Sequence, residues 1–199
     1  MKIKPEALLF DLDGVLVDSI DAWWYSLNEA FEKYNEKPIS LEEFKKIYWG
    51  HDLFYNIEKN NLSFEIGNEC NKLYYKHLDK VKMFPEVDSV LNSLKNYKKC
   101  LVTNTPRDST SKILEKLKID KYFTKVFTSN DVKMAKPNPE IIFLACDFLQ
   151  IKPEEAVLIG DTESDILAGR NANCKIIGVR INGDYRIESL DELKNILLN

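Results

Sequence analysis

The chain has 199 residues, of which 44% are hydrophobic and 30% are charged, so we expect one folded domain or one domain with an insertion. The formal net charge of −4 gives no support for nucleic-acid binding, and no apolar stretch approaches the length of a membrane-spanning helix. The four cysteines are scattered and the N-terminus does not resemble a signal peptide, so we expect a cytoplasmic protein with reduced thiols.

The first predicted strand, Ala7–Phe10, is a short apolar run that ends directly at two acids, Asp11 and Asp13. Alternate residues of an extended chain point the same way, so the two carboxylates can converge on one site. Unpaired buried charge is costly, and a divalent cation with a phosphorylated substrate would account for both acids. Gly14 then permits a turn and a close approach of backbone to a ligand. The alternative is that Asp11 only ends the strand, as turn acids often do.

Residues 18–82 interrupt the alternation of strands and helices and are predicted to be helical throughout. Apolar residues from Ile20 to Tyr34 follow the spacing of an amphipathic helix, and Leu62 to Leu78 is a second helical candidate. We therefore predict a core formed by residues 1–17 and 83–199, with a helical insertion, residues 18–82, hinged near 17–19 and 82–85.

The remaining strands are short apolar runs separated by helical patterns, as in βαβ units. The predicted strands are Lys99–Thr103, Lys125–Thr128, Ala156–Ile159 and Lys175–Val179, and the clearest helices are Asp108–Lys118 and Asn138–Leu149. Continuously apolar strands suit a parallel sheet that is covered on both faces. The prediction is an α/β fold with a Rossmann-like, doubly wound parallel sheet and an inserted α-helical domain. Ligands of such sheets bind beyond the carboxyl ends of the strands.

Three further motifs lie at those carboxyl ends. Thr103 ends the second strand, Lys136 stands in a proline-rich turn, and Asp161 ends a later strand with Asp165 four residues on. Together with Asp11-Leu12-Asp13-Gly14, these motifs resemble the haloacid dehalogenase superfamily. The resemblance covers essentially the whole chain and is strongest for the phosphoglycolate phosphatase and β-phosphoglucomutase-like branch, in which the helical insertion corresponds to a cap domain.

The resemblance implies a Mg²⁺-dependent enzyme. The metal ligands would be the Asp11 carboxylate, the Asp13 backbone carbonyl and Asp161, with Asp165 contacting the metal through water or supporting the other ligands. Mg²⁺ prefers an octahedral shell of oxygen ligands and usually keeps several waters, which suits this set. The alternative for Asp165 is a purely structural role at the start of a helix.

The same resemblance assigns roles in catalysis. Asp11 would attack phosphorus and form an aspartyl-phosphate, and Asp13 would act as the general acid and base. Lys136 would neutralise negative charge, and Thr103 would donate a hydrogen bond to the phosphate. The superfamily's dehalogenases do not carry an acid two residues after the nucleophile, so Asp13 argues for phosphorus chemistry. A solvated Lys136 and a plain strand-end Thr103 are the alternatives.

Substrate-binding residues are predicted to include Thr103, Lys136 and, through its backbone amide, Asn104. His51, between two helices of the insertion, and Arg107, after the Thr motif, are further candidates for contact with an anionic substrate. Both have an ordinary alternative as solvated side chains.

The leading interpretation is a phosphatase, a phosphoric monoester hydrolase, that acts on a small phosphorylated metabolite as a monomer or homodimer. The alternatives are a sugar phosphomutase of the β-phosphoglucomutase type and a non-catalytic regulatory relative. Mutases of the β-phosphoglucomutase type place a His where Trp23 stands, which weakens the mutase alternative. Phosphoglycolate phosphatases usually have glycines where Glu86 and Asn173 stand, which weakens an assignment to phosphoglycolate.

Overall fold

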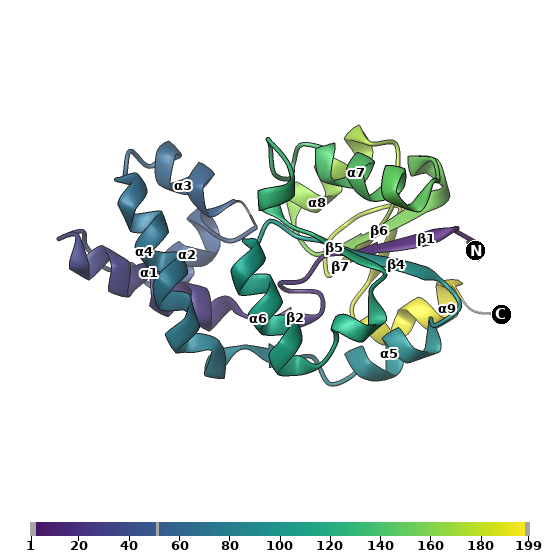
Figure 1. Ribbon diagram of the computed structural model, residues 1–199, viewed down its shortest axis with the longest axis horizontal. Coiled ribbons are helices and arrows are strands. Elements are labelled where there is room, and N and C mark those ends of the chain that lie inside the picture. The colour runs from purple at the N-terminus through teal and green to yellow at the C-terminus, as the bar shows by residue number, and fades with distance from the viewer. Residues whose placement is uncertain (1–2, 51, 198–199) are drawn as a thin grey trace.

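The computed structural model describes residues 3–50 and 52–197 and contains a six-stranded sheet in the order β5-β4-β1-β6-β7-β8, with every neighbouring pair parallel (Figure 1). The strands are β1 Ala7–Phe10, β4 Lys98–Val102, β5 Lys125–Phe127, β6 Ala156–Gly160, β7 Lys175–Val179 and β8 Tyr185–Ile187. This arrangement confirms the predicted α/β fold and all five predicted strands of the sheet, with ends that shift by at most one residue. The short edge strand β8 was not predicted.

Strand β1 lies in the middle of the sheet and is buried on both faces. Leu8 and Phe10 belong to one hydrophobic cluster, and Ala7 and Leu9 belong to a second cluster on the opposite face. Alternate side chains of a strand point to opposite faces, so both faces need apolar residues and the strand is apolar throughout.

Helices cover both faces of the sheet. Helices α7 (Glu140–Leu149) and α8 (Glu163–Asn171) lie on one side, and α5 (Val87–Ser93) and α9 (Leu193–Leu197) lie on the other (Figure 1). Helix α6 (Arg107–Leu117) contributes Ile113 and Leu114 to the same cluster as Leu8 and Phe10. The sheet is therefore doubly wound.

The helical insertion contains α1 (Ile20–Lys33), α2 (Leu41–Ile47), α3 (Leu53–Lys59) and α4 (Phe64–Tyr74), followed by a 3₁₀ helix, Tyr75–Lys80. Local signals start three of these helices, because Ser40, Asp52 and Ser63 each accept a backbone N–H from the first turn. Helices α1 and α4 pack together, and the rings of Trp23 and Tyr74 are stacked with centroids 4.1 Å apart.

Two short strands join the helical insertion to the rest of the chain. Strand β2 (Val17–Asp18) pairs antiparallel with β3 (Lys82–Met83), with Val17 opposite Met83 and Asp18 opposite Lys82. The predicted boundaries at 17/18 and 82/83 fall within this ribbon, and the division into two domains stays a proposal.

Several predicted helix ends differ from the structure. The helix predicted from Leu62 to Leu78 corresponds to α4, which ends at Tyr74, because the chain continues from Tyr75 as the 3₁₀ helix. Helix α7 begins at Glu140 rather than Asn138, whose side-chain oxygen accepts the Glu140 N–H at 3.0 Å. Within the described residues, no helix is both long and apolar enough to cross a membrane.

Candidate active site

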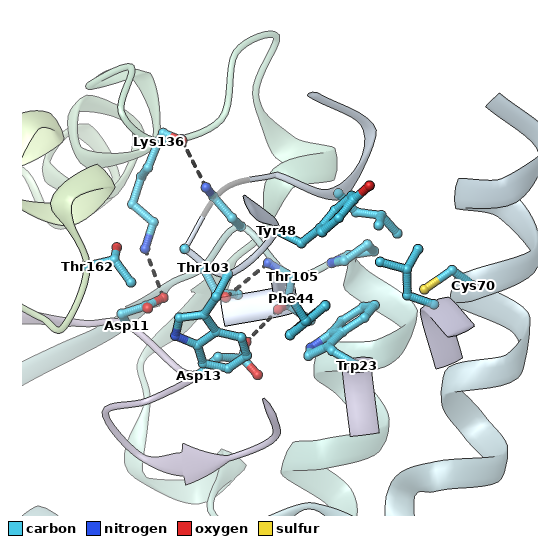
Figure 2. Close-up of a pocket in the computed structure, with 16 residues that line it drawn as sticks. Asp11, Asp13, Trp23, Phe44, Tyr48, Cys70, Thr103, Thr105, Lys136 and Thr162 are labelled. Atoms are coloured by element: carbon cyan, nitrogen blue, oxygen red, sulfur yellow. Dashed lines mark hydrogen bonds and ion pairs between the residues drawn. The ribbon is translucent and has the colours of Figure 1, made fainter. Parts of the chain in front are cut away.

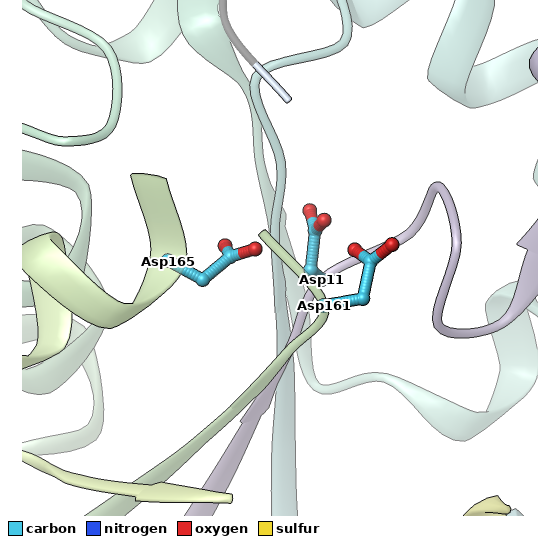
Figure 3. Close-up of side chains that lie close together, drawn as sticks. All are labelled: Asp11, Asp161 and Asp165. Carbon is cyan, nitrogen blue, oxygen red and sulfur yellow. The ribbon is translucent and has the colours of Figure 1, made fainter. Parts of the chain in front are cut away.

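The carboxyl ends of β1 and β6 bring three acids together. Asp11 follows β1, Asp161 follows β6, and Asp165 lies in the first turn of α8 (Figure 3). Each residue offers a carboxylate oxygen, and these oxygens all lie within 4.8 Å of one another. Neighbouring strands pair Phe10 with Ile159, so Asp11 follows at the level of Gly160 and Asp161 lies one residue further along, at the same edge of the sheet. The expectation that Asp11 and Asp161 share one edge of the sheet agrees with this placement.

Lys136 is 3% exposed and joins two of these acids. Its ammonium donates hydrogen bonds to Asp11 Oδ1 at 2.8 Å, to Asp165 Oδ1 at 2.6 Å and to the Val102 carbonyl at 2.9 Å. The alternative of a solvated loop lysine is therefore wrong. All three ammonium hydrogens have acceptors, which orients the charge towards Asp11.

The backbone of Lys136 is held by a single side chain, Asn104. The Asn104 amide donates to the Lys136 carbonyl at 2.9 Å, and its oxygen accepts the Lys136 N–H at 2.9 Å. Asn104 also lines the pocket described below. Its side chain therefore positions the Lys136 turn, a role that was not predicted, and its predicted contact to phosphate stays a proposal.

Asp13 is surrounded by hydrogen-bond donors. Ser19 and Thr105 donate their hydroxyls to its two carboxylate oxygens, Thr105 at 2.5 Å, and the Trp23 side chain donates a further hydrogen bond. Burial raises the pKa of Asp13 above its ordinary value, and these hydrogen bonds oppose that rise. Ser19 and Thr105 were not predicted, because residues 6 and 92 positions from Asp13 carry no local signal that places them beside it.

Like charges and burial perturb the acids. Burial raises the pKa of Asp11 to about 7, Lys136 opposes the rise, and Asp165 adds to it. Burial, followed by repulsion from Asp11 and Asp165, raises the pKa of Asp161 well above its ordinary value. Burial disfavours the charged form of Lys136, but Asp11 and Asp165 outweigh this effect and raise its pKa.

The acids fit a divalent cation. Asp161 Oδ1 is buried and has no hydrogen-bond partner within the described residues, which is costly for a carboxylate oxygen. Gly14 has φ +78°, and a Cβ there would lie 1.9 Å from Asp161 Oδ2, so only glycine allows this approach. Carboxylate oxygens are the ligands that Mg²⁺ prefers, and Asp11 and Asp161 offer them side by side.

Asp165 makes contacts that satisfy it without a metal. Its Oδ2 accepts a hydrogen bond from Thr162 Oγ1 at 2.6 Å, and its Oδ1 accepts from Lys136. Thr162 is the N-cap of α8 and accepts in turn from the Asp165 backbone N–H. Asp165 thus has a structural role at the start of α8, which the sequence analysis gave as an alternative. It also positions Lys136. Its part in metal binding stays a proposal.

Arg180, at the end of β7, was not predicted. Its guanidinium donates to the Gly14 carbonyl, lies 5.5 Å from the centroid of the Phe84 ring and attracts Asp161, so it opposes the rise of the Asp161 pKa. Arg180 therefore joins the loop after β1, the segment after β3 and the acid after β6.

A cavity of about 80 Å³ opens beside Asp11 and Asp13, between the sheet edge and the helical insertion (Figure 2). Its core-side lining includes Asp11, Asp13, Thr103, Asn104, Thr105, Pro106, Lys136 and Thr162. Its lining from the helical insertion is Trp23, Leu27, Phe44, Tyr48, Trp49, Gly50, Leu53 and Cys70. The structure thus brings the four predicted catalytic residues, Asp11, Asp13, Thr103 and Lys136, to one cavity.

One predicted substrate contact, Arg107, does not line this cavity. Arg107 is absent from its lining, and the Arg107 side chain is 58% exposed and pairs with Asp131 at 2.5 Å. Arg107 begins helix α6 after Pro106, and its own N–H bonds to the Asn130 side chain, which turns it towards the segment after β5. The structure thus places Arg107 away from this cavity, and its predicted contact with the substrate stays a proposal. His51 lies outside the described residues.

Comparisons with known proteins show the family of this chain. The family model of the haloacid dehalogenase-like hydrolases matches residues 8–179. The chain belongs to this family. It is 30% identical over 215 aligned positions to pyrophosphatase PpaX of Bacillus cereus, an alignment that covers 99% of this chain and 98% of the relative.

Solved structures share the fold. The structure of CbbY from Rhodobacter sphaeroides in complex with phosphate has a TM-score of 0.85 at 19% identity, covering 95% of this chain and 96% of CbbY. A subfamily IA hydrolase of the superfamily from Geobacter sulfurreducens has a TM-score of 0.81 at 24% identity, covering 96% and 98% of the two chains. The family match and the relatives named pyrophosphatase confirm the predicted superfamily. They also confirm the prediction that the chain is an enzyme of the phosphatase class.

Proposed function

We propose that this protein is a Mg²⁺-dependent phosphatase that hydrolyses a small phosphomonoester through an aspartyl-phosphate on Asp11. One observation carries the proposal: buried Lys136 pairs with Asp11, while Asp13, two residues on, is held by separate donors at the same cavity. A nucleophile and a proton donor thus stand side by side in distinct electrostatic surroundings, as acid–base and nucleophilic roles require.

In the first step, an Asp11 oxygen forms a bond to phosphorus and the bond from phosphorus to the leaving oxygen breaks. Lys136 reduces the repulsion between Asp11 and the anionic phosphoryl group, because its ammonium is 2.8 Å from Asp11 Oδ1. Thr103 is buried at the cavity and supplies a hydroxyl for a phosphate oxygen. Asp13 donates its proton to the leaving oxygen as that bond breaks.

In the second step, a water oxygen forms a bond to phosphorus, and the bond from phosphorus to the Asp11 oxygen breaks. Asp13 takes a proton from this water, so inorganic phosphate is released and the Asp11 carboxylate is regenerated. The raised pKa of Asp13 favours the protonated form needed in the first step. Ser19, Thr105 and Trp23 hold the carboxyl group in place, so it does not reorient between the two steps.

Asp11 and Asp161, with Asp165 and the Asp13 carbonyl as further candidates, are the residues that would hold Mg²⁺. When bound, the ion would supply positive charge that stabilises the phosphoryl group and the carboxylates around it. The buried, unpartnered Asp161 oxygen supports this assignment.

Hydrolysis of pyrophosphate is a second candidate function. It is favoured by the B. cereus relative named pyrophosphatase, whose alignment covers 99% of this chain. The two candidates use the same residues and differ only in the group that leaves.

The test is phosphate release from p-nitrophenyl phosphate with Mg²⁺ and with EDTA. We expect release with Mg²⁺ that EDTA removes, together with a phosphorylated protein that intact mass spectrometry detects after rapid acid quench. Asp11→Asn should show neither, whereas Asp21→Asn, an exposed acid of α1, should behave as the wild type. Equal release in EDTA would contradict the metal requirement, and a phosphorylated Asp11→Asn protein would contradict the nucleophile.

A further inference from the structure

The wall of the cavity that faces the acids is apolar and aromatic. The helical insertion contributes Trp23, Leu27, Phe44, Tyr48, Trp49, Leu53 and Cys70 to the lining, along with Gly50. Figure 2 shows Trp23, Phe44, Tyr48 and Cys70 on one side of the space and Asp11, Thr162 and Lys136 on the other. The cavity therefore has a charged half, where the phosphoryl group would react, and an apolar half beyond it.

The aromatic part of this wall is held in place by its own contacts. The rings of Phe44 and Tyr48 are stacked with centroids 6.1 Å apart, and the ring centroids of Trp49 and Phe44 are 6.3 Å apart. The Tyr48 carbonyl accepts a hydrogen bond from the buried Asn56 side chain at 2.8 Å, and the Trp49 N–H donates to the Phe44 carbonyl at 3.1 Å. A wall fixed in this way needs little further ordering when it binds an apolar group.

The charged lining residues that the structure describes are Asp11, Asp13 and Lys136, and all three belong to the charged half. Lys136 already has three hydrogen-bond acceptors in the protein, so its ammonium is committed to the reacting end. A carboxylate or second phosphate on the leaving group would lie against aromatic rings and lose its hydration there. Burying such a charge without a partner is costly, whereas burying an apolar group is favourable.

From this arrangement we propose that the natural substrate is the phosphate ester of an uncharged alcohol or phenol with an apolar or aromatic body, which the insertion's wall of Phe44, Tyr48, Trp49 and Leu53 binds. This inference rests on the proposed phosphatase activity and selects among its substrates. It places phosphoglycolate and pyrophosphate, whose leaving groups are anions, among the poor substrates.

The experiment compares matched esters that differ by one charge. Phenyl phosphate is paired with 4-carboxyphenyl phosphate, and ethyl phosphate with phosphoglycolate, with pyrophosphate as a fifth compound. We expect kcat/KM to favour the uncharged member of each pair by about tenfold or more, mainly through KM, because an apolar site rejects an unpaired charge. Pyrophosphate should be hydrolysed more slowly than phenyl phosphate.

A charge added to the wall should change this preference. Trp49→Lys places an ammonium beside the leaving group, so the ratio of kcat/KM for phenyl over 4-carboxyphenyl phosphate should fall by about tenfold. Ile47→Lys is the control, because Ile47 is 39% exposed, lies two residues away on α2 and does not line the cavity. The control should keep the wild-type ratio. Leu53→Lys, at the start of α3, repeats the test at a second wall position.

The outcomes separate this inference from the proposed function. No Mg²⁺-dependent release from any of the five compounds would contradict the phosphatase itself. Release with the charged member preferred in both pairs would leave the phosphatase standing and overturn the apolar leaving group. An unchanged ratio in both folded wall variants, checked by circular dichroism, would show that these residues do not contact the leaving group and would overturn the inference as well.

Discussion

Replacing Lys136 by methionine should test the electrostatic design of the site most directly. Methionine has a similar length but no charge, so Lys136→Met keeps the packing and removes the ammonium that lies between Asp11 and Asp165. We expect the variant to lose activity and also stability, because the acids would then share a buried site without a cation. The loss of stability is the informative quantity, since it can be measured without substrate.

The contacts of Lys136 determine how much stability the Lys136→Met variant should lose. Lys136 donates hydrogen bonds of 2.8, 2.6 and 2.9 Å to Asp11, Asp165 and the Val102 carbonyl. Hydrogen bonds to charged groups contribute about 1.5–3 kcal/mol each, but the acids can take up protons and so recover part of the loss. Removing one partner of a buried ion pair costs about 3–5 kcal/mol, and we expect the free energy of unfolding to fall by this amount at pH 8.

The pH dependence has a definite sign. Lys136 opposes the rise of the Asp11 pKa, so this pKa should climb above its wild-type value of about 7 in Lys136→Met. A carboxyl group whose pKa is raised in the folded state lowers the free energy of unfolding most at pH values above that pKa. This loss of stability shrinks as the pH falls and is gone below the pKa that the group has in the unfolded chain. The deficit of the variant should therefore be small near pH 5 and should grow as the pH rises to 8.

Urea denaturation in EDTA, followed by circular dichroism, measures these values. Lys133→Met is the matched control, because Lys133 lies in the same segment and is exposed. Its stability should stay within about 0.5 kcal/mol of the wild type at both pH values. A deficit below about 1 kcal/mol for Lys136→Met at pH 8, or one that grows as the pH falls, would refute the reasoning.

Three further substitutions separate the roles of the other residues. Asp11→Asn should lower kcat by about 10⁴-fold or more without lowering stability, since it removes one of several like charges; a small loss would contradict the nucleophile. Trp23→Phe keeps an aromatic ring against Tyr74 but removes the hydrogen bond that lowers the pKa of Asp13, so the Asp13 limb of the pH–rate profile should move to higher pH. A profile that does not move would show that this hydrogen bond is unimportant. Asp161→Asn should raise stability in EDTA by about 1–3 kcal/mol, yet abolish the rise in Tm that Mg²⁺ gives the wild type. A variant that Mg²⁺ still stabilises would contradict its role as a ligand.

The sheet could be predicted because its strands are buried on both faces. Runs such as Ala7–Phe10 and Ala156–Gly160 have no polar alternation, so they differ clearly from the amphipathic helices around them. Strand β8 carries no such signal: it has three residues, lies at the edge of the sheet and exposes Arg186. The strands β2 and β3 were also not predicted. Each has only two residues, the two strands come from distant parts of the chain, and no local pattern specifies their pairing.

Residues of the site that end a strand could be found from the sequence, and those recruited from elsewhere could not. Asp11, Thr103 and Asp161 each follow an apolar run, and parallel strands place such residues at one edge. Thr105, Ser19 and Arg180 have no comparable marker. Their importance arises from contacts across the fold, such as the hydrogen bond of Thr105 to Asp13, 92 positions away. The position of Arg107 away from the cavity has the same origin, because its pairing with Asp131 depends on where α6 lies.

The sequence by itself determined the α/β sheet, the edge at which the acids meet and, through its motifs, the superfamily. These properties follow from short-range patterns, because burial selects apolar residues and parallel pairing aligns strand ends. Only the tertiary structure decided that Lys136 is shared between Asp11 and Asp165, that Asn104 holds its backbone, and that aromatic rings face the acids across the cavity. These features depend on side chains from distant segments meeting at distances near 3 Å, and such meetings are a property of the folded chain.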